Sequence, residues 1–407
     1  MNRRAKTVWL GSALVVCAVL GWYGFGADSG AAVPNSAGGS TRPLSVVPAG
    51  HLGAASQPVS AGGGPYSAAG LQSRQEQLAL WRGRYERAEH IYASYRDATR
   101  YPYDSRPITE HPDQVRPFAP IAEELKLRNA QGDEVKGMRL RTSQERVFLS
   151  GAESVKFTIA VRDEDDRPLP LVIRNAQAQS IPDSRTPIKL VQTNVAFSDD
   201  GAGADDASRD GTYSGRLTPA SQGFQQVAGT IRLLVELAAD GQQGVAHFDV
   251  VYMPDVPATW AGVREALEAG SLNFYLKANV RQAGRYVVSA RVDDANGVPF
   301  ALLQFNGEVA AGGREFRLQV FGALVLDKSP AFPLRLRDVD GFLLIPDKFP
   351  DRSTMARQAG VVHVSAVYPK SRFSPAEWSS EERQRYLTEY GKDAETAKRQ
   401  VEELSGR

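Results

Sequence analysis

The sequence has a single cysteine, Cys17, among 407 residues, and it lies inside an apolar N-terminal run. A body without cysteine cannot hold a disulfide, a Cys-x-x-Cys redox pair or a cysteine-based metal site. Histidine is scarce too, and the five histidines are scattered along the chain: His51, His90, His111, His247 and His363. They show no zinc-binding spacing, and the sequence has no Gly-x-Ser-x-Gly, phosphate-loop or dinucleotide motif. No catalytic constellation is therefore expected.

The chain also lacks an excess of charge of either sign. Of the 48 basic residues, Arg3, Arg4 and Lys6 precede the apolar run, which leaves 45 basic against 47 acidic residues in the rest of the chain. A balance so close to neutral gives no overall electrostatic attraction to nucleic acid. Nucleic acid is therefore not an expected partner.

One long apolar run is present, Val8–Gly26, and it contains no charged residue. Nineteen residues at about 1.5 Å each nearly span a hydrocarbon core of about 30 Å. The preceding positive charges place residues 1–7 in the cytoplasm by the positive-inside rule. We expect an inner-membrane anchor over residues 8–26, with the bulk of the chain in the periplasm. A cleaved signal peptide and a secreted body are the alternative.

Residues 27–70 are rich in Gly, Ala, Ser and Pro and predict a flexible tether. Residues 71–100 predict an amphipathic helix, because apolar residues recur at spacings of three and four. Its stripe includes the four aromatic candidates for partner binding: Trp81, Tyr85, Tyr92 and Tyr95. The stripe could dock on the first β domain or form a dimer seam. We expect docking, because the stripe covers less than three heptads.

The rest of the chain predicts a mainly β fold between helical ends. Residues 101–135 are Pro-punctuated and predict an extended connector, while period-two patterns predict two Ig-like β-sandwiches over 136–254 and 255–370. Residues 371–407 predict a helical tail. Ser379 and Glu382 form a capping box there, Gly391 is expected to end one helix, and Asp393–Leu404 to form another.

An Asp-rich segment between two predicted strands is the most distinctive local feature. Five aspartates occur within residues 199–210: Asp199, Asp200, Asp205, Asp206 and Asp210. Carboxylates interspersed with glycine can fold around Ca²⁺, but the spacing is not that of an EF-hand. The favoured interpretation is a turn whose side chains accept local backbone N–H groups, with Ca²⁺ as the alternative and no other cofactor.

Two further charged groups are interpreted as structural. The acidic pairs Asp293/Asp294 and Asp338/Asp340 could imitate a glycosidase dyad, but hairpin turns account for them. The segment Leu334–Phe342 alternates Arg, Asp and apolar residues, and predicts an edge strand and turn whose charges discourage edge pairing.

The Asp-rich segment, ending in Asp210-Gly211-Thr212-Tyr213, resembles Ig-like domains of uncharacterised bacterial envelope proteins. The segments Gly284–Arg291 and Phe300–Leu303, with the turn Asp294–Gly297 between them, resemble the second sandwich of the same proteins, some of which are grouped as choice-of-anchor X. The resemblance covers roughly residues 140–370. It implies an extracytoplasmic, non-enzymatic module and transfers no catalytic residue.

These observations predict a non-enzymatic, membrane-anchored envelope protein. Its two modules would bind or scaffold another envelope protein in the periplasm. A glycan-binding module is an alternative and would need an exposed aromatic platform, for which Trp260, Trp378 and the tyrosine stripe are the sources. An envelope hydrolase with a non-local active site is the other alternative.

Overall fold

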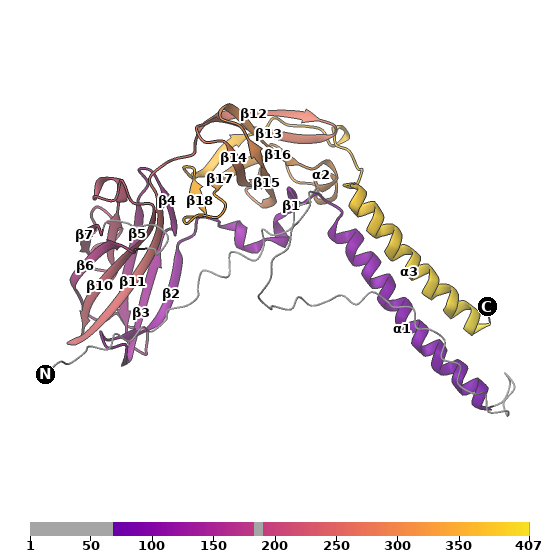
Figure 1. Ribbon diagram of the computed structural model, residues 1–407, viewed down its shortest axis with the longest axis horizontal. Helices are drawn as coiled ribbons and strands as arrows, with labels where there is room; N and C mark the ends of the chain where they lie inside the picture. Colours follow the sequence, from indigo (N-terminus) through magenta and orange to yellow (C-terminus); the bar gives the residue numbers. More distant parts are fainter. Residues whose placement is uncertain (1–67, 183–189, 407) are drawn as a thin grey trace, which may run out of the picture. The chain divides into compact units, whose positions relative to one another are not determined.

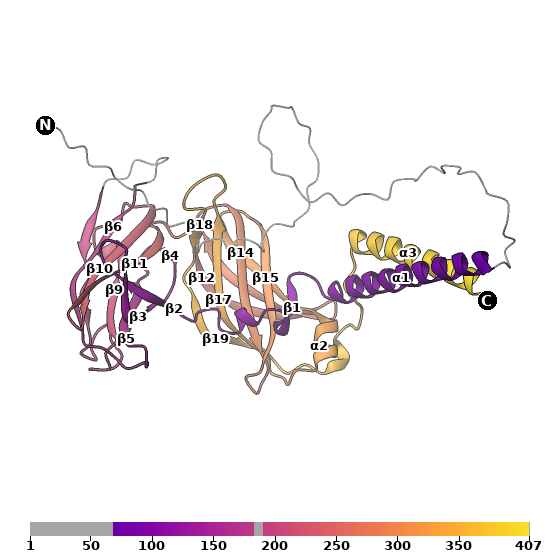
Figure 2. The ribbon, with the colours of Figure 1, turned by 90° about the horizontal axis from the view of Figure 1, so that it is seen from below.

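Alternating apolar and polar residues build a first β module over residues 121–253. The computed structural model describes residues 68–182 and 190–406, and Figures 1 and 2 show it in two orientations. Ten strands form one sheet in the order β7-β6-β10-β11-β2-β3-β5-β9-β8, with β4 parallel to β11. The strands are β2 (Ile121–Arg128), β3 (Glu134–Gln144), β4 (Phe148–Ser150), β5 (Val155–Arg162), β6 (Leu171–Ser180), β7 (Gln192–Asn194), β8 (Phe197–Ser198), β9 (Tyr213–Leu217), β10 (Gly229–Ala239) and β11 (Gln242–Met253).

The sheet of the first module folds over a single core. Only one residue pair, Val245 with Arg128, joins β11 to β2, so the sheet can turn sharply there. The rings of Phe157 in β5 and Phe248 in β11 then meet across the fold, 4.7 Å apart at their centroids. In β5 the residues at every second position from Val155 to Val161 are fully buried, as the two-residue period of a strand requires.

A second β module has its own core and follows from residue 258. Its large sheet has the order β1-β15-β14-β17-β18, with β19 also paired to β17, and its small sheet has the order β12-β13-β16. Tyr286 of the large sheet packs on Phe316 of the small one, with 5.5 Å between ring centroids. The elements are β1 (Ser105–Pro107), β12 (Ala258–Glu268), β13 (Ser271–Val280), β14 (Gly284–Asp293), β15 (Pro299–Val309), β16 (Gly312–Val320), α2 (Gly322–Lys328), β17 (Arg335–Leu344), β18 (Arg352–Thr354) and β19 (Gln358–Val364).

The predicted connector, residues 101–135, is divided between the two modules. Strand β1 pairs with β15 of the second module. Two short 3-10 helices follow, η2 (Ile108–Glu110) and η3 (Pro112–Val115), and β2 already belongs to the first module. The predicted start of the first module at residue 136 is therefore wrong. Strand β2 was not predicted. Only Leu127 in it is buried, so buried and exposed positions do not alternate along this strand.

The two long helices pair with each other. Helix α1 (Ala68–Ala98) and helix α3 (Glu381–Ser405) lie side by side in both views (Figures 1 and 2). Arg74 Nε donates to the carbonyl oxygen of Leu404 over 2.8 Å, and Arg383 Nε donates to Thr99 Oγ1 over 3.0 Å. The start of one helix therefore meets the end of the other, and the pair is antiparallel.

The limits of α3 differ from those predicted. Its N-cap is Ser380, whose hydroxyl accepts the N–H of Arg383, and not Ser379. Gly391 does not end a helix but lies inside α3. A Cβ at Gly391 would be in van der Waals contact with Tyr92 of α1, 3.7 Å away, so glycine serves here as a small residue at the helix seam.

No helix within residues 68–182 and 190–406 is long and apolar enough to cross a membrane. The predicted anchor at residues 8–26 and nearly all of the predicted tether lie outside the residues that the structure describes. All described residues belong to one unit, residues 65–407, and the architecture between its helices is mainly β.

Candidate functional site

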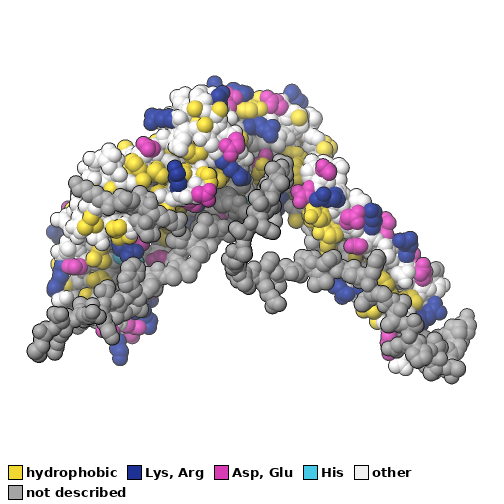
Figure 3. Space-filling view, in the orientation of Figure 1, with side chains coloured by type: hydrophobic (Ala, Val, Ile, Leu, Met, Phe, Trp, Pro, Cys, Tyr) yellow, Lys and Arg dark blue, Asp and Glu magenta, His cyan; other side chains and the backbone are white. Residues whose placement is uncertain are grey.

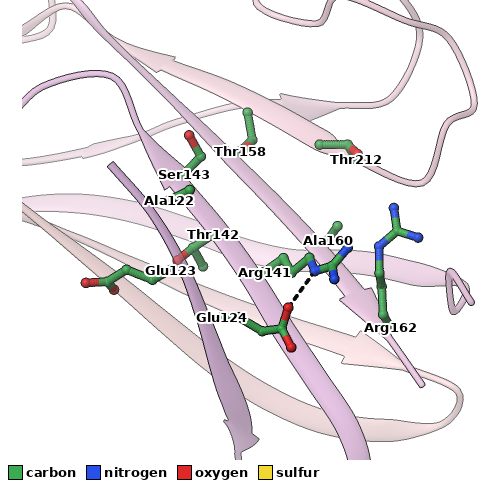
Figure 4. Close-up of a pocket in the computed structure, with 10 residues that line it drawn as sticks. All are labelled: Ala122, Glu123, Glu124, Arg141, Thr142, Ser143, Thr158, Ala160, Arg162 and Thr212. Atoms are coloured by element: carbon green, nitrogen blue, oxygen red, sulfur yellow. Dashed lines mark hydrogen bonds and ion pairs between the residues drawn. The ribbon is translucent and has the colours of Figure 1, made fainter. Parts of the chain in front are cut away.

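An open hollow of about 430 Å³ lies on the outer face of the first module (Figure 4). It is lined by residues of β2, β3 and β5 and by one residue just before β9: Ala122, Glu123, Glu124, Arg141, Thr142, Ser143, Thr158, Ala160, Arg162 and Thr212. The strand register explains this composition. Ala122, Ser143 and Thr158 are direct partners across three strands, so their small side chains form the floor.

Charged side chains form one rim of this hollow. Arg141 Nε donates to Glu124 Oε2 over 2.8 Å, and Arg139 Nη1 donates to Glu124 Oε1 over 2.7 Å. Arg141 Nη2 also lies 2.7 Å from Asp166 Oδ1. The hydrogen bonds from Arg141 and Arg139 lower the pKa of Glu124, so this rim stays ionised near neutral pH. Both charge signs are present, and the rim selects no single sign.

The floor offers hydroxyl groups. The side-chain hydroxyls of Ser143, Thr158 and Thr212 make no hydrogen bond to any residue that the structure describes. No histidine lines the hollow, so Ser143 has no imidazole base beside it for nucleophilic attack. An open, polar and neutral surface of this kind suits recognition of a polar partner.

The Asp-rich loop adjoins the same face. Asp199 accepts the backbone N–H groups of Asp210 and Gly211, each over 3.1 Å, and Asp205 Oδ2 accepts the N–H of Gly201 over 2.7 Å. This last bond lowers the pKa of Asp205. Ser214 of β9 donates to Asp205 Oδ1 over 3.1 Å. These carboxylates thus bind the loop to itself and to β9.

The remaining aspartates of the loop are similarly occupied. Asp200 Oδ1 accepts the N–H of Ala202, and Asp210 Oδ1 accepts that of Thr212. Asp206 forms an ion pair with Lys156, 2.7 Å away. In the described part of the chain no three His, Cys, Asp or Glu side chains are grouped so that they could hold a metal ion. The contacts are of the kind that the turn interpretation requires, and Ca²⁺ binding stays a prediction to be tested.

The aromatic stripe of α1 faces α3. Tyr95 contacts Tyr386 and Tyr390, and Tyr92 lies against Gly391. Trp81 and Tyr85 are half-buried on the same side, and Arg84 covers the ring of Trp81 at 4.6 Å. The expectation that this helix docks on the first module is therefore wrong. On the face shown in Figure 3, both charge signs and hydrophobic side chains are interspersed along the helices.

A buried layer of arginine and aspartate in the second module was missed by sequence reasoning. Asp293 has no exposed surface, and Arg291 is 8% exposed. Asp293 Oδ2 accepts Arg291 Nη2 over 3.1 Å and Arg337 Nη1 over 3.0 Å. Asp338 Oδ2 accepts Arg337 Nε over 3.0 Å, and Asp338 Oδ1 accepts the N–H of Gly360 over 2.8 Å. Alternating charged and apolar residues, as in residues 335–340, predict a strand with one face in solvent, so nothing in the sequence indicated that these charges are buried.

Two predictions about these charges are therefore corrected. Strand β17 is not an edge strand, because β14 pairs with it on one side and β18 and β19 on the other. Asp293, Asp338 and Asp340 lie in strands rather than in hairpin turns. Only Asp294 occupies a turn, where its Oδ1 accepts the N–H groups of Asn296 and Val298.

The aromatic and histidine candidates do not gather at one place. Trp260 packs against the second core and donates Nε1–H to Ala356 O over 2.8 Å. His247 is exposed on β11, and His363 of β19 lies 3.1 Å from Glu265 Oε2. None of these residues lines the polar hollow of the first module.

No family model and no curated protein matches this sequence. Among solved structures, the chain is similar to a DUF4785 family protein from Legionella pneumophila, with 13% identity and a TM-score of 0.39, over 57% of this chain and 58% of that one. It is also similar to Escherichia coli alpha-2-macroglobulin in its native conformation, with 12% identity and a TM-score of 0.22, over 59% of this chain and 18% of that one. A third similar structure is dimeric latent PorU from Porphyromonas gingivalis, with 9% identity and a TM-score of 0.16, over 60% of this chain and 34% of that one. The matches span less than two thirds of each of these proteins, and no function is carried over from them.

Proposed function

We propose that this chain is a non-enzymatic protein of a bacterial envelope. Residues 8–26 anchor it in the inner membrane, and two Ig-like β-sandwiches are held in the periplasm to bind or scaffold another envelope protein. The anchor and the export rest on the apolar run with Arg3, Arg4 and Lys6 before it. The Ig-like assignment rests on the resemblance of residues 140–370 and on two mainly antiparallel modules with separate cores.

The polar hollow of the first module is the observation that favours binding over catalysis. It presents hydroxyls that make no hydrogen bond to a described residue, on a floor of small residues beside the neutral rim formed by Glu124, Arg141 and their partners. Polar groups of a polypeptide can replace water at such hydroxyls, whereas stacking of a sugar needs an exposed aromatic ring. No aromatic residue lines the hollow, so a protein partner is favoured over a glycan.

Photo-cross-linking in intact cells tests this surface. A photoreactive amino acid at Ser143, on the floor of the hollow, should trap one discrete envelope protein. The same amino acid at His247, exposed on β11 outside the hollow, serves as the control and should trap much less. Equal trapping from both positions would show that the hollow is not the binding surface.

A charge reversal gives a matched second test. Arg141→Glu places a third acidic side chain beside Glu124 and Asp166 and should abolish the cross-link from Ser143. Arg232→Glu breaks a comparable ion pair with Asp249 in β11 and should leave the cross-link intact. Loss of the cross-link in both variants would indicate general damage to the module.

The topology is tested separately. An enzymatic reporter that is active only after export should be active when it is fused after residue 407. Activity of a reporter that works only in the cytoplasm would overturn the export, and recovery of a soluble, shortened periplasmic chain would replace the anchor by a cleaved signal peptide.

A further inference from the structure

A second hollow, of about 500 Å³, lies beside the buried arginine and aspartate layer of the second module. Its lining combines residues of the large sheet with a short segment that begins at the last residue of η3: Val115, Arg116, Pro117, Phe118, Ala119, Arg291, Pro299, Arg337 and Asp338. A volume of this size falls in the usual range of small-molecule sites, about 300–1,000 Å³.

In this layer the aspartate oxygens already face arginine donors or a backbone N–H, and Asp293 Oδ1, which accepts no hydrogen bond from a described residue, lies 2.9 Å from Arg291 Nε. Asp293 Oδ2 already accepts two arginines, and each oxygen of Asp338 accepts one donor. By contrast, Arg291 Nη1 and Arg337 Nη2 make no hydrogen bond to a described residue. A ligand that completes this arrangement must therefore supply acceptor oxygens.

The charges also favour an anion. The two arginines are matched by Asp293 and Asp338, and Arg116 adds a positive charge that is not paired with any described residue. Arg291 is more than nine-tenths buried, so an anion beside it would be only weakly screened by water. Planar guanidinium groups match the geometry of a carboxylate or a phosphate.

The other wall of the hollow is apolar and held in place. Val115, Pro117, Phe118, Ala119 and Pro299 supply it. The N–H of Ala119 donates to Arg116 O over 3.1 Å, which closes a turn. The guanidinium of Arg357 lies over the ring of Phe118, 4.9 Å from its centroid. A wall that is already ordered costs little further entropy when a ligand binds.

We propose that this hollow binds a carboxylate that carries an apolar group, such as the C-terminal residue of a peptide. The carboxylate faces Arg291, Arg337 and Arg116, and the apolar group lies against the wall around Phe118. This inference goes beyond the proposed function, because it concerns a different module and a small ligand rather than the polar hollow.

Calorimetric titration of the full chain in detergent, at low salt, tests the proposal. N-acetyl-L-phenylalanine should bind, and its carboxamide should bind at least about tenfold more weakly, a difference of 1.4 kcal/mol. Acetate, which lacks the apolar group, should also bind more weakly. Failure of the acid to bind, or equal binding of the acid and the amide, would overturn the proposal. Inorganic phosphate that binds as tightly as the acid would do so too.

Two variants locate the binding without disturbing the buried layer. Arg116→Ala removes an exposed charge and should weaken binding of the acid about threefold or more, while Ala119→Trp should fill the hollow and abolish binding. Arg285→Ala changes an exposed arginine of the same strand as Arg291, outside the lining, and should leave the affinity unchanged. Unchanged binding in both Arg116→Ala and Ala119→Trp would place the ligand elsewhere and refute the assignment.

Discussion

The ring of Tyr95 in α1 meets the ring of Tyr390 in α3 edge-on, with 5.4 Å between centroids and an interplanar angle of 74°. Tyr386 approaches the same ring at 5.7 Å, and Tyr386 and Tyr390 stack on each other. Burial raises the pKa of Tyr95, which agrees with its position in the seam. One tyrosine of α1 thus joins the helices through two tyrosines of α3.

Substitution of Tyr95 should destabilise the helical pair. Tyr95→Ala removes two edge-to-face contacts worth about 0.5–1.5 kcal/mol each, together with part of the burial of a large side chain. We expect a loss of about 1–3 kcal/mol in the free energy of unfolding, measured by urea titration. The exposed Glu89 on the same helix is the control, and Glu89→Ala should cost less than about 0.5 kcal/mol.

The same experiment distinguishes a pair within one chain from a dimer seam. Because α3 belongs to the same chain, the unfolding midpoint should not change with protein concentration. A double-mutant cycle of Tyr95 with Tyr390 should show a coupling energy of about 0.5 kcal/mol or more. Sedimentation as a dimer that Tyr95→Ala converts to a monomer would instead make the seam intermolecular.

The helix of residues 71–100 and its apolar stripe could be predicted, but its partner could not. A stripe shows which side of a helix is covered and carries no information about what covers it. The complementary stripe on α3 includes Tyr390, Ala394 and Ala397. The prediction divided this stripe at Gly391, because glycine commonly ends a helix. Only the packed structure shows that this glycine lies inside α3, where it faces α1.

Strands were predicted where alternation is strict, as in β5, and were missed where both faces have similar exposure. The same reasoning failed for β17, because period-two charges indicate solvent on one face. In this strand Arg337 pairs with Asp293 and Asp338, and Asp340 pairs with Arg357, so three of its four charges have partners from a neighbouring residue or segment. Both hollows depend on residues from several strands, and a sequence shows no sign of such neighbours.

The buried position of Asp293 leads to a large predicted stability effect. Asp293→Ala leaves Arg291 and Arg337 without their shared acceptor, and breaking a buried ion pair costs about 3–5 kcal/mol. Asp249 in β11 is a matched control, because it pairs with Arg232 at the surface, where loss of an ion pair costs less than about 1 kcal/mol. Chemical denaturation measures both, and equal effects would contradict the buried role of Asp293.

The Asp-rich loop gives a prediction about Ca²⁺. Because Asp199, Asp205 and their neighbours are bound to backbone N–H groups, millimolar Ca²⁺ should not raise the melting temperature of the parent. The double variant Asp205→Asn with Asp206→Asn should be equally insensitive. A rise of several degrees in the parent that is lost in the variant would show a Ca²⁺ site.

The same loop should contribute to acid sensitivity. The pKa of Asp205 is lowered by the hydrogen bond from Gly201, so its contribution to stability is present above the ordinary aspartate pKa of about 3.9 and is lost as pH falls through the lowered value. Asp205→Asn should therefore lower the melting temperature at neutral pH by a few degrees and by less in acid. Asp206→Asn, at an exposed residue, should change it little at either pH.

Asp104 should affect the pH dependence of stability in the opposite direction to Asp205. Its Oδ1 is buried and has no hydrogen-bond partner among the described residues, and burial raises its pKa, with Arg317 opposing the rise. The folded state then holds this proton more tightly than the unfolded state does, so the contribution of Asp104 to stability is greatest below about pH 3.9 and falls as pH rises through the raised pKa. An asparagine stays neutral and lacks this loss.

We expect Asp104→Asn to gain stability over the parent with increasing pH and to be the more stable protein at pH 7, as measured by urea unfolding at several pH values. Asp113→Asn, at an exposed aspartate, should show a flat difference. A variant less stable than the parent at pH 7 would mean that the carboxylate of Asp104 has a stabilising partner.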